Sequence, residues 1–287
     1  MSTFTKIKAI RESLSHSELK LADFILNSST AIREFSSQEL ANVAGVSQSS
    51  VVKFTQKLGY KGYPKFKLAI IDAINSEQST ENLHGKITWN DSLEQLASKL
   101  LSSKVAVLNE TKNLNESGNV VQAISLLKSA KRILICGLGG SALVGYDFSC
   151  KLQKIGLTAM ANADPHAQLV LAATFGKDDL VFAISESGHT HEIVHICQQA
   201  KQCGASIISL SKYGKTPVSD LADVKLYSVA ETNSLRLSSI LARTAQEYII
   251  DILFIALTQA SRKSRRLLEK TNNIVTELKK SKNNYSG

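Results

Sequence analysis

The sequence predicts two domains: a small all-α domain at the N-terminus and a larger α/β domain with a doubly wound parallel sheet. The first observation is the length, because 287 residues suffice for two domains of ordinary size. The second is that short apolar segments alternate with helical patterns only beyond residue 130, as in a parallel sheet covered on both faces. The third is the charge. Residues 1–75 hold ten Lys and Arg against six Asp and Glu, residues 261–287 hold eight against two, and the middle is close to neutral.

A chain with two basic ends and a near-neutral middle fits a small-molecule-binding domain joined to a part that binds a polyanion. A need for solubility would also explain the basic ends. An apolar share of 43% excludes disorder as the main state. The longest apolar stretch, 248–257, is about half a membrane span, and the first residues lack the apolar core of a secretion signal. We therefore expect a cytoplasmic protein with no membrane partner.

The cysteines give no sign of a metal or redox site. None of them forms a CxxC pair, so we expect reduced thiols, no metal and no cofactor. They are Cys136, Cys150, Cys197 and Cys203.

Two capping boxes open helices in the N-terminal part. Ser15 with Glu18 precedes one apolar helical pattern, and Ser36 with Glu39 precedes a second that stops at Gly45. A glycine adopts the left-handed conformation at low cost, so Gly45 is expected to end that helix.

The next segment completes a helix-turn-helix pattern. Ser47 can cap a helix that runs to Gly59, after a short turn that contains a glycine. Polar side chains at the start of this second helix suit base edges, and lysines at about one-turn spacing suit phosphates. The expected DNA-binding residues are Ser47, Gln48, Ser49, Ser50, Lys53, Lys57 and Lys61. The alternative is a three-helix scaffold with a soluble face.

A polar linker follows the N-terminal domain. We place the helix-turn-helix domain at 1–75, the linker at 76–90, the second domain at 91–265 and a basic helix or tail at 266–287. Trp89 is expected to dock the far end of the linker, and a long helix is expected over 91–115.

The second domain is expected to contain five strands. They are Arg132–Cys136, Leu157–Ala161, Leu180–Ile184, Ser206–Leu210 and Lys225–Ser228. Helices are expected at 141–155, 166–174, 189–203, 215–222 and 237–260. In such sheets ligands bind at the carboxyl ends of the strands.

Two loops lie at those strand ends. The first, 137–142, matches the dinucleotide pattern G-x-G-x-x-A with Asp164 about twenty residues on, but a glycine-rich turn before a helix serves any phosphate. The second, SESGHT at 185–190, gathers three hydroxyl groups before a helix and can wrap one phosphate. Ordinary capping by Ser187 or Thr190 would explain one of those hydroxyls.

These segments resemble known families. GLGGSALVG, SESGHT with its S-x-S-G-x-T pattern and AETNSLRLSS resemble the SIS (sugar isomerase) domain, a phosphosugar-binding doubly wound fold. SSQELANVAGVSQSSVVKFTQKLGYKGYPKFKLAI resembles the helix-turn-helix of the RpiR family of bacterial regulators. Together they cover nearly the whole chain. The resemblance implies an all-α helix-turn-helix N-terminal domain and an α/β doubly wound parallel-sheet SIS domain.

The resemblance also implies roles for residues. Ser141, Ser185, Ser187 and Thr190 would hold a sugar's phosphate, and Glu231 matches a position near the sugar. Glu186 stands where synthase-type SIS domains usually have Gln. Because a carboxylate repels phosphate, we expect its side chain to turn away.

Three further positions stay open. His166 could donate to a sugar hydroxyl or acetamide, or could be a helix-start histidine without a role. Arg243 could add positive charge to the ligand site or form an intersubunit pair. His191 and His195 are four apart on a helix but have no third ligand, so we expect a solvated face.

Three functions compete. A repressor of amino-sugar catabolism would use both halves, with operator DNA and an N-acetylated hexosamine 6-phosphate as partners. For the effector, N-acetylmannosamine 6-phosphate ranks first and N-acetylmuramic acid 6-phosphate second. A sugar-phosphate isomerase leaves the N-terminal domain unexplained, and a nicotinamide enzyme rests only on the first loop and Asp164. We expect no catalysis, and a homodimer or higher oligomer held by the helices 91–115 and 237–260.

Overall fold

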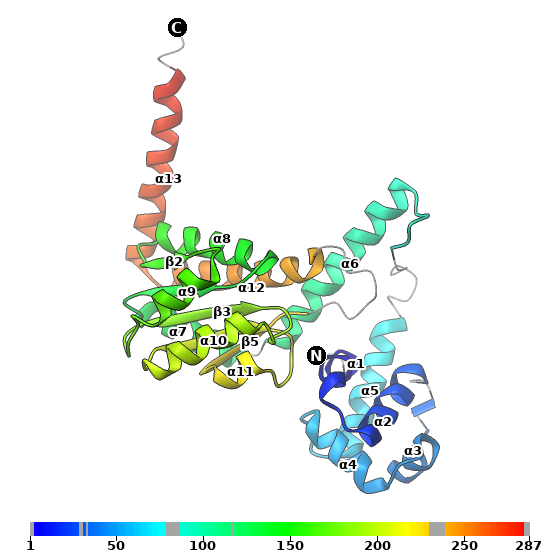
Figure 1. The fold of residues 1–287 in the computed structure, drawn as a ribbon. Coiled ribbons are helices and arrows are strands. Elements are labelled where there is room, and N and C mark those ends of the chain that lie inside the picture. The colour runs from blue at the N-terminus through cyan, green and yellow to red at the C-terminus, as the bar shows by residue number, and fades with distance from the viewer. Residues whose placement is uncertain are drawn as a thin grey trace. The chain divides into compact units, whose positions relative to one another are not determined.

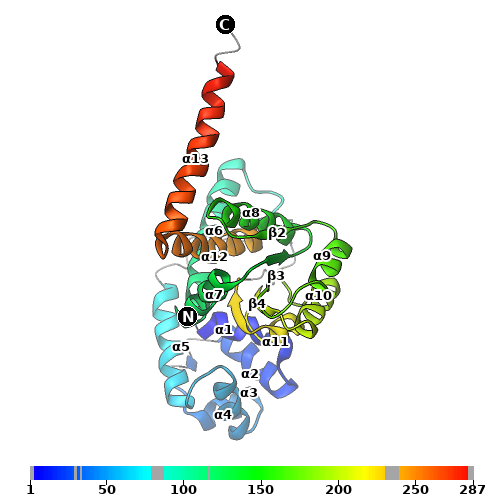
Figure 2. The same ribbon diagram turned by 90° about the vertical axis from the view of Figure 1, so that its left-hand side faces the viewer.

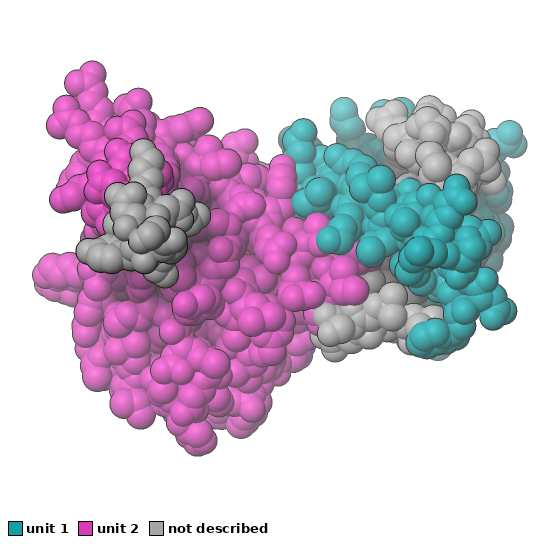
Figure 3. Space-filling model, turned by 90° about the horizontal axis from the view of Figure 1, so that it is seen from above, with its two compact units in different colours: residues 1–114, 213–215 teal, residues 115–212, 216–287 magenta. Residues whose placement is uncertain are grey.

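The chain forms two compact units. The computed structural model describes residues 3–28, 31–32, 34–78, 87–115, 117–229 and 239–283. One unit comprises residues 1–114 with 213–215, and the other comprises residues 115–212 with 216–287 (Figure 3). The first unit thus extends through the long helix that follows the linker, and the domain limits given above stay predictions.

The described part of the first unit is helical. A short 3-10 helix, Arg11–Ser13, follows its first helix. Its α-helices are α1 (Thr3–Ile10), α2 (His16–Asn27), α3 (Ser37–Ala44), α4 (Gln48–Lys57), α5 (Tyr63–Gln78) and α6 (Leu93–Leu114) (Figure 1). One apolar core joins α1 to α5, and its members include the fully buried Ile7, Leu21, Leu40, Phe54 and Phe66. Burial of these side chains is the main force that holds the short helices together.

Local hydrogen bonds fix the helix ends as the sequence predicts. The Ser36 amide donates to Glu39 Oε2 at 2.7 Å and the Glu39 amide to Ser36 Oγ at 3.2 Å, which is the predicted capping box. Gly45 ends α3 with φ 65°, in the left-handed region. Ser47 then caps α4 by accepting from the Ser50 amide at 3.2 Å. The predicted helix-turn-helix is confirmed.

One expectation for the linker is wrong. Trp89 is 85% exposed, so it does not dock the far end of the linker against a core. The Thr88 amide and hydroxyl instead donate to the Asp91 carboxylate, a polar turn that fixes the chain before α6 without using the indole. Residues 79–86 lie outside the described part of the chain.

The second unit contains a five-stranded parallel sheet in the order β2-β1-β3-β4-β5. The strands are β1 (Ile133–Cys136), β2 (Ala159–Ala161), β3 (Leu180–Ser185), β4 (Ser206–Ser211) and β5 (Val224–Tyr227). The helices are α7 (Ser117–Ser129), α8 (Gly140–Lys154), α9 (Pro165–Ala172), α10 (His191–Gln202), α11 (Pro217–Leu221), α12 (Ile240–Gln259) and α13 (Arg262–Asn283). The predicted strands are present with small shifts at their ends. β2 starts two residues late because Leu157 still closes the end of α8, where its amide bonds Leu152 O at 3.1 Å.

Helices cover both faces of the sheet, as a doubly wound fold requires. One core layer lies between the sheet and α7, α8 and α12, and the other lies between the sheet and α9, α10 and α11 (Figure 2). Alternate residues of β1 face opposite layers, Ile133 and Ile135 toward the first, Leu134 and Cys136 toward the second. The beginning of α13 packs on α8 and α12, and its remainder extends away from the sheet (Figure 1). Within the described residues, no helix combines the length and apolar character that crossing a bilayer needs.

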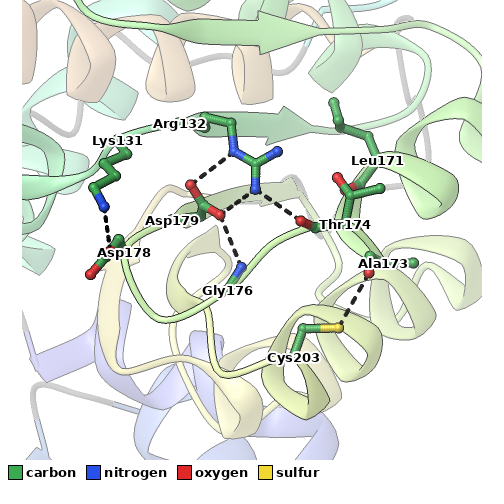
Figure 4. A network of polar contacts seen from close by, with 9 residues as sticks. All are labelled: Lys131, Arg132, Leu171, Ala173, Thr174, Gly176, Asp178, Asp179 and Cys203. Carbon is green, nitrogen blue, oxygen red and sulfur yellow. Dashed lines mark hydrogen bonds and ion pairs between the residues drawn. The ribbon is translucent and has the colours of Figure 1, made fainter.

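An ion pair ties together the beginnings of β1 and β3. Arg132 donates to both carboxylate oxygens of Asp179, at 3.0 and 2.5 Å, and to Thr174 O at 2.8 Å (Figure 4). Asp179 also accepts from the Gly176 amide at 2.9 Å, and its side chain is only 7% exposed. The hydrogen bonds from Arg132 hold the pKa of Asp179 below its ordinary value, although burial opposes them.

Replacing Asp179 by Asn should therefore destabilise the second unit. We expect a loss of about 2–3 kcal/mol in the free energy of unfolding, because Arg132 loses its charged partner in a half-buried site. Because the folded pKa is lowered, this stabilisation is present above about pH 4 and is lost as the pH falls through the folded value. Urea unfolding followed by circular dichroism between pH 3 and 7 measures both effects.

Asp178→Asn is the matched control. Asp178, the residue before Asp179, pairs with Lys131, but both of these side chains are exposed, so we expect a much smaller loss of stability. Equal losses in the two variants would contradict the assigned role of Asp179.

Candidate functional site

The candidate site is a polar pocket at the carboxyl ends of β1 and β3. These strands pair side by side, while the chain continues from β1 to β2 on the other edge, so the sheet changes winding direction here. Ligands of doubly wound folds bind at this switch point. The pocket has a volume of about 210 Å³. Its wall consists of Leu138, Gly139, Gly140, Ser141, Ile184, Ser185, Glu186, Ser187, Thr190 and Ser239.

The first loop turns tightly from β1 into α8. Gly139 has φ 55° at the position before the helix, and a side chain on Gly137 would come within 3.0 Å of the Ser141 carbonyl. The loop thus needs its glycines to bring the first turn of α8 to the strand end. The positive end of the α8 dipole then faces the pocket, which favours an anion.

Two buried amides that the sequence analysis did not single out hold this loop. Gln246, on α12 and 1% exposed, donates to Ser141 Oγ at 3.2 Å. Gln168, on α9 and fully buried, donates to Gly137 O at 3.1 Å. In the sequence, each of these residues is only a single amide on an otherwise apolar helix face. That pattern does not indicate which loop the amide contacts.

The second loop brings its hydroxyl groups together. Ser185 Oγ lies 3.0 Å from Thr190 Oγ1 and accepts from the Gly188 amide at 3.2 Å, and the His189 amide donates to Ser187 Oγ at 3.1 Å. Thr190 occupies the capping position of α10, but its side chain does not cap the helix. Capping therefore does not account for the hydroxyl groups.

Neighbouring segments hold the second loop in place. Glu186 O accepts from the Lys212 amide at 3.0 Å, and Gly188 O accepts from the Val218 amide at 3.2 Å. Gly188 has φ 69° and lies directly against Thr216, the residue that caps α11, so a side chain here would overlap Thr216. The loop is thus attached through its backbone to the segment between β4 and α11.

The expectation that Glu186 turns away is wrong. Ser239 Oγ, in the same pocket wall, donates to Glu186 Oε2 in a long hydrogen bond of 3.5 Å, so the carboxylate lies beside the pocket. Ser239 has φ 56° and precedes α12. It is the one non-glycine with a positive φ in the described part of the chain, and such strain is typical of binding sites.

Arg243 lies next to the first loop. Its Cδ and Cγ are 3.3 and 3.4 Å from the point where a side chain on Gly140 would begin, so the glycine makes room for it. Its Nε is buried and has no hydrogen-bond partner among the described residues. A buried donor of this kind gains free energy when an anion binds to it.

The other predicted site residues are less closely placed. His166 is exposed at the start of α9 and is not in the pocket wall, and Glu231 lies outside the described residues. Asp164 accepts from the His166 amide at 2.9 Å as the cap of α9, which gives that carboxylate a structural role and weakens the nicotinamide alternative. His191 and His195 are exposed and lie with their Nε2 atoms 3.1 Å apart.

Four of the predicted DNA-binding residues, at 47–50, lie at the start of α4, whereas Lys57 is the last residue of this helix and Lys61 follows it. Ser47 Oγ contacts the hydroxyls of Ser49 and Ser50 at 2.8 and 2.9 Å, and Gln48 donates to Ser37 Oγ at 2.9 Å. These side chains form a polar, exposed surface at the end of the helix.

The three lysines differ. All three are exposed, but Lys57 Nζ also donates to Ser13 O and Glu18 Oε2, each at 2.9 Å. Burial raises the pKa of Glu18, but hydrogen bonds from Lys57 and Ser15 outweigh it and lower that pKa overall. Lys57 therefore stabilises the packing of α4 on α2.

Comparisons with known proteins match both the N-terminal helix-turn-helix part and the α/β part of the chain. Residues 1–77 match the model of the helix-turn-helix domain of the rpiR family, and residues 126–256 match that of the SIS domain. The chain is 38% identical over 261 residues to the HTH-type transcriptional regulator YfhH of Escherichia coli strain K12, covering 90% of this chain and 93% of that one.

Two solved structures share the fold. The Vibrio vulnificus NanR protein, complexed with ManNAc-6P, superposes with a TM-score of 0.61 at 23% identity, over 96% of this chain and 98% of that one. The sugar isomerase domain of an RpiR transcription factor from Sphaerobacter thermophilus gives 0.57 at 17% identity, over 62% of this chain and 99% of that one.

Replacing Gly188 by Ala should disrupt the second loop. The left-handed backbone alone costs about 1–2 kcal/mol with a side chain, and the overlap with Thr216 adds to it. We expect a larger drop in melting temperature than for Gly204→Ala, because Gly204 has a similar φ of 81° but its nearest neighbour is 4.0 Å away. Hydrogen exchange over 185–190 should also rise in the Gly188 variant alone. Equal effects of the two substitutions would contradict the contact with Thr216.

Proposed function

This chain belongs to the RpiR family of helix-turn-helix transcriptional regulators, and we propose that it represses genes of amino-sugar catabolism until an N-acetylated hexosamine 6-phosphate binds to it.

 The phosphosugar binds in the SIS domain and relieves repression, and N-acetylmannosamine 6-phosphate is the first candidate. The observation that carries the proposal is the group of hydroxyls at the carboxyl ends of β1 and β3, next to the start of α8. The relative that is 38% identical is itself a regulator, so DNA binding and not catalysis is the activity of this chain.

The phosphate end of the effector would bind to the two loops. We assign Ser141, Ser185, Ser187 and Thr190 as hydroxyl donors to the phosphate oxygens, with the first turn of α8 behind them. Arg243 would add a charged donor, because its buried Nε has no partner within the described residues.

The sugar end is assigned more coarsely. The fold shared with NanR, which was solved with ManNAc-6P, supports a hexosamine phosphate as the ligand class. We propose that Glu231 accepts from a sugar hydroxyl and that His166 donates to a hydroxyl or to the acetamide, from its own subunit or a neighbouring one. N-acetylmuramic acid 6-phosphate remains the second candidate.

Operator DNA would bind at the start of α4. We assign Ser47, Gln48, Ser49 and Ser50 to base edges and phosphates, because all four are exposed or half-buried at this helix start. We assign Lys53, within α4, and Lys61, beyond its end, to phosphates, because both are exposed. Lys57 was predicted for the same role. Because its amine forms an ion pair with Glu18, we propose instead that Lys57 stabilises the domain.

One reading helix contacts too little DNA for tight and specific binding, so we propose a homodimer on a palindromic operator. Large apolar side chains are exposed on both helices to which we assign dimerisation, which supports the assignment. They are Leu93, Leu101 and Val105 on α6, and Ile255 on α12.

The effector should weaken the operator complex by about 5–150-fold, the range that an allosteric coupling of about 1–3 kcal/mol produces. Linkage requires the operator to weaken effector binding by the same factor. Calorimetric titration of the full chain with N-acetylmannosamine 6-phosphate, with and without operator, measures both.

The Ser141→Ala, Ser185→Ala double variant should bind operator normally and ignore the effector. Loss of operator binding in that variant would show that the serines support the fold. A tighter operator complex with effector in the wild-type protein would reverse the sign of regulation.

Lys53→Ala should weaken binding to every DNA sequence and lower the log–log salt slope by about 0.9, as expected for one lost phosphate contact. Lys57→Ala should instead lower the stability of the N-terminal domain by about 1 kcal/mol and leave the slope unchanged. Filter binding between 50 and 200 mM salt, together with thermal unfolding, separates the two. A lower salt slope in Lys57→Ala, or a loss of stability without a change of slope in Lys53→Ala, would contradict the roles assigned to these lysines.

A further inference from the structure

Gln246 lies directly behind one hydroxyl group of the pocket. Ser141 is half-buried in the pocket wall, whereas Gln246, on α12, is 1% exposed and does not belong to the wall that the structure describes. Both polar atoms of the amide contact this hydroxyl. Gln246 Nε2 donates to Ser141 Oγ at 3.2 Å, and Ser141 Oγ is 3.4 Å from Gln246 Oε1, to which it can donate.

We propose that Gln246 is a positioning residue for the effector, whose amide directs the proton of the Ser141 hydroxyl toward the phosphate. This inference rests on the proposed function and deepens it, because it adds a residue that acts on the effector through Ser141. The role differs from holding the loop, since it concerns the direction of one O–H bond and not the path of the backbone.

The hydrogen-bonding capacity of a serine hydroxyl limits what this pair can do. Such a hydroxyl has one proton and two lone pairs. The proton of Ser141 therefore goes either to Gln246 Oε1 or to a phosphate oxygen. A lone pair can accept from Gln246 Nε2 while the proton points into the pocket. Of the two contacts, the one from Nε2 is thus the shorter and is also the one that a bound phosphate permits.

The burial of the amide makes this arrangement persist when the ligand binds. A buried N–H group that loses its partner costs free energy, so Gln246 Nε2 keeps its bond to Ser141. A hydroxyl that accepts one hydrogen bond also donates a stronger one, by roughly 10–30%. The amide therefore both directs the Ser141 proton and strengthens its bond to the phosphate.

Helix packing sets the distance between the two residues. α8 and α12 belong to the same core layer of the second unit. Arg243, one turn before Gln246 on α12, lies against Gly140, the residue before Ser141. The amide is thus in place before any ligand arrives, as a positioning group must be.

A double-mutant cycle of Gln246→Met and Ser141→Ala tests this role. Methionine has nearly the size of glutamine but no amide. Affinities of the full chain are measured by calorimetry for whichever candidate effector the wild-type protein binds more tightly. We expect Ser141→Ala to weaken binding about tenfold or more, as for a lost charge-assisted hydrogen bond, and Gln246→Met to weaken it about threefold to tenfold. In the Ser141→Ala background, Gln246→Met should cause no further loss, because the hydroxyl that the amide directs is gone.

Gln168→Met is the matched control. Gln168 is a buried amide that holds the same loop, but it bonds the Gly137 carbonyl and not the Ser141 side chain. Any loss of affinity that it causes should therefore persist in the Ser141→Ala background.

Three outcomes would overturn the inference and leave the proposed function intact. They are wild-type affinity in Gln246→Met, wild-type affinity in Ser141→Ala, and equal losses from Gln246→Met with and without the Ser141 hydroxyl. Failure of the wild-type protein to bind either candidate effector would overturn both the inference and the proposed function.

A second measurement needs no variant of Gln246. In protein labelled with ¹⁵N in its glutamine side chains, the Nε2 protons of Gln246 should exchange slowly with water, and their resonances should shift when the effector is added. The same sugar without its phosphate should not shift them. Faster exchange of these protons in the presence of the effector would mean that the bond to Ser141 breaks, and would overturn the inference even if Gln246→Met did not fold.

Discussion

The parallel pairing of β1 with β3 is the constraint on which the candidate site depends. In the register, Cys136 pairs with Ala183, so β3 continues for two residues beyond the end of β1. Ser185 is therefore still within the sheet where the first loop has already turned into α8, and the two loops meet over one pocket. The ion pair of Arg132 with Asp179 fixes the same two strands at their other ends.

The elements around the two loops then determine where the polar groups of the loops lie. Buried amides on α9 and α12 hold the first loop, and the segment before α11 holds the second through backbone hydrogen bonds. A binding site supported in this way keeps its geometry without relying on the ligand. The fold itself thus positions the hydroxyl groups of the candidate site.

The two domains, the strands and the hydroxyl loop could be predicted from the sequence because each depends on local patterns. Capping boxes, glycines and short apolar runs act over a few residues. Gln246 could not be found in this way, since it reaches Ser141 across 105 positions of the chain. The same holds for Lys57, whose partner Glu18 lies 39 positions away, and for Glu186, whose direction depends on Ser239.

The bond between Ser185 and Thr190 has a consequence for the strength of binding. Both hydroxyls already have partners within the loop, so an anion that binds there exchanges existing hydrogen bonds for charge-assisted ones. The net gain is the difference between the two kinds of bond, which limits affinity while keeping the loop ordered. Under the proposed function, such a site would release its ligand readily, and its occupancy would follow the concentration of a metabolite.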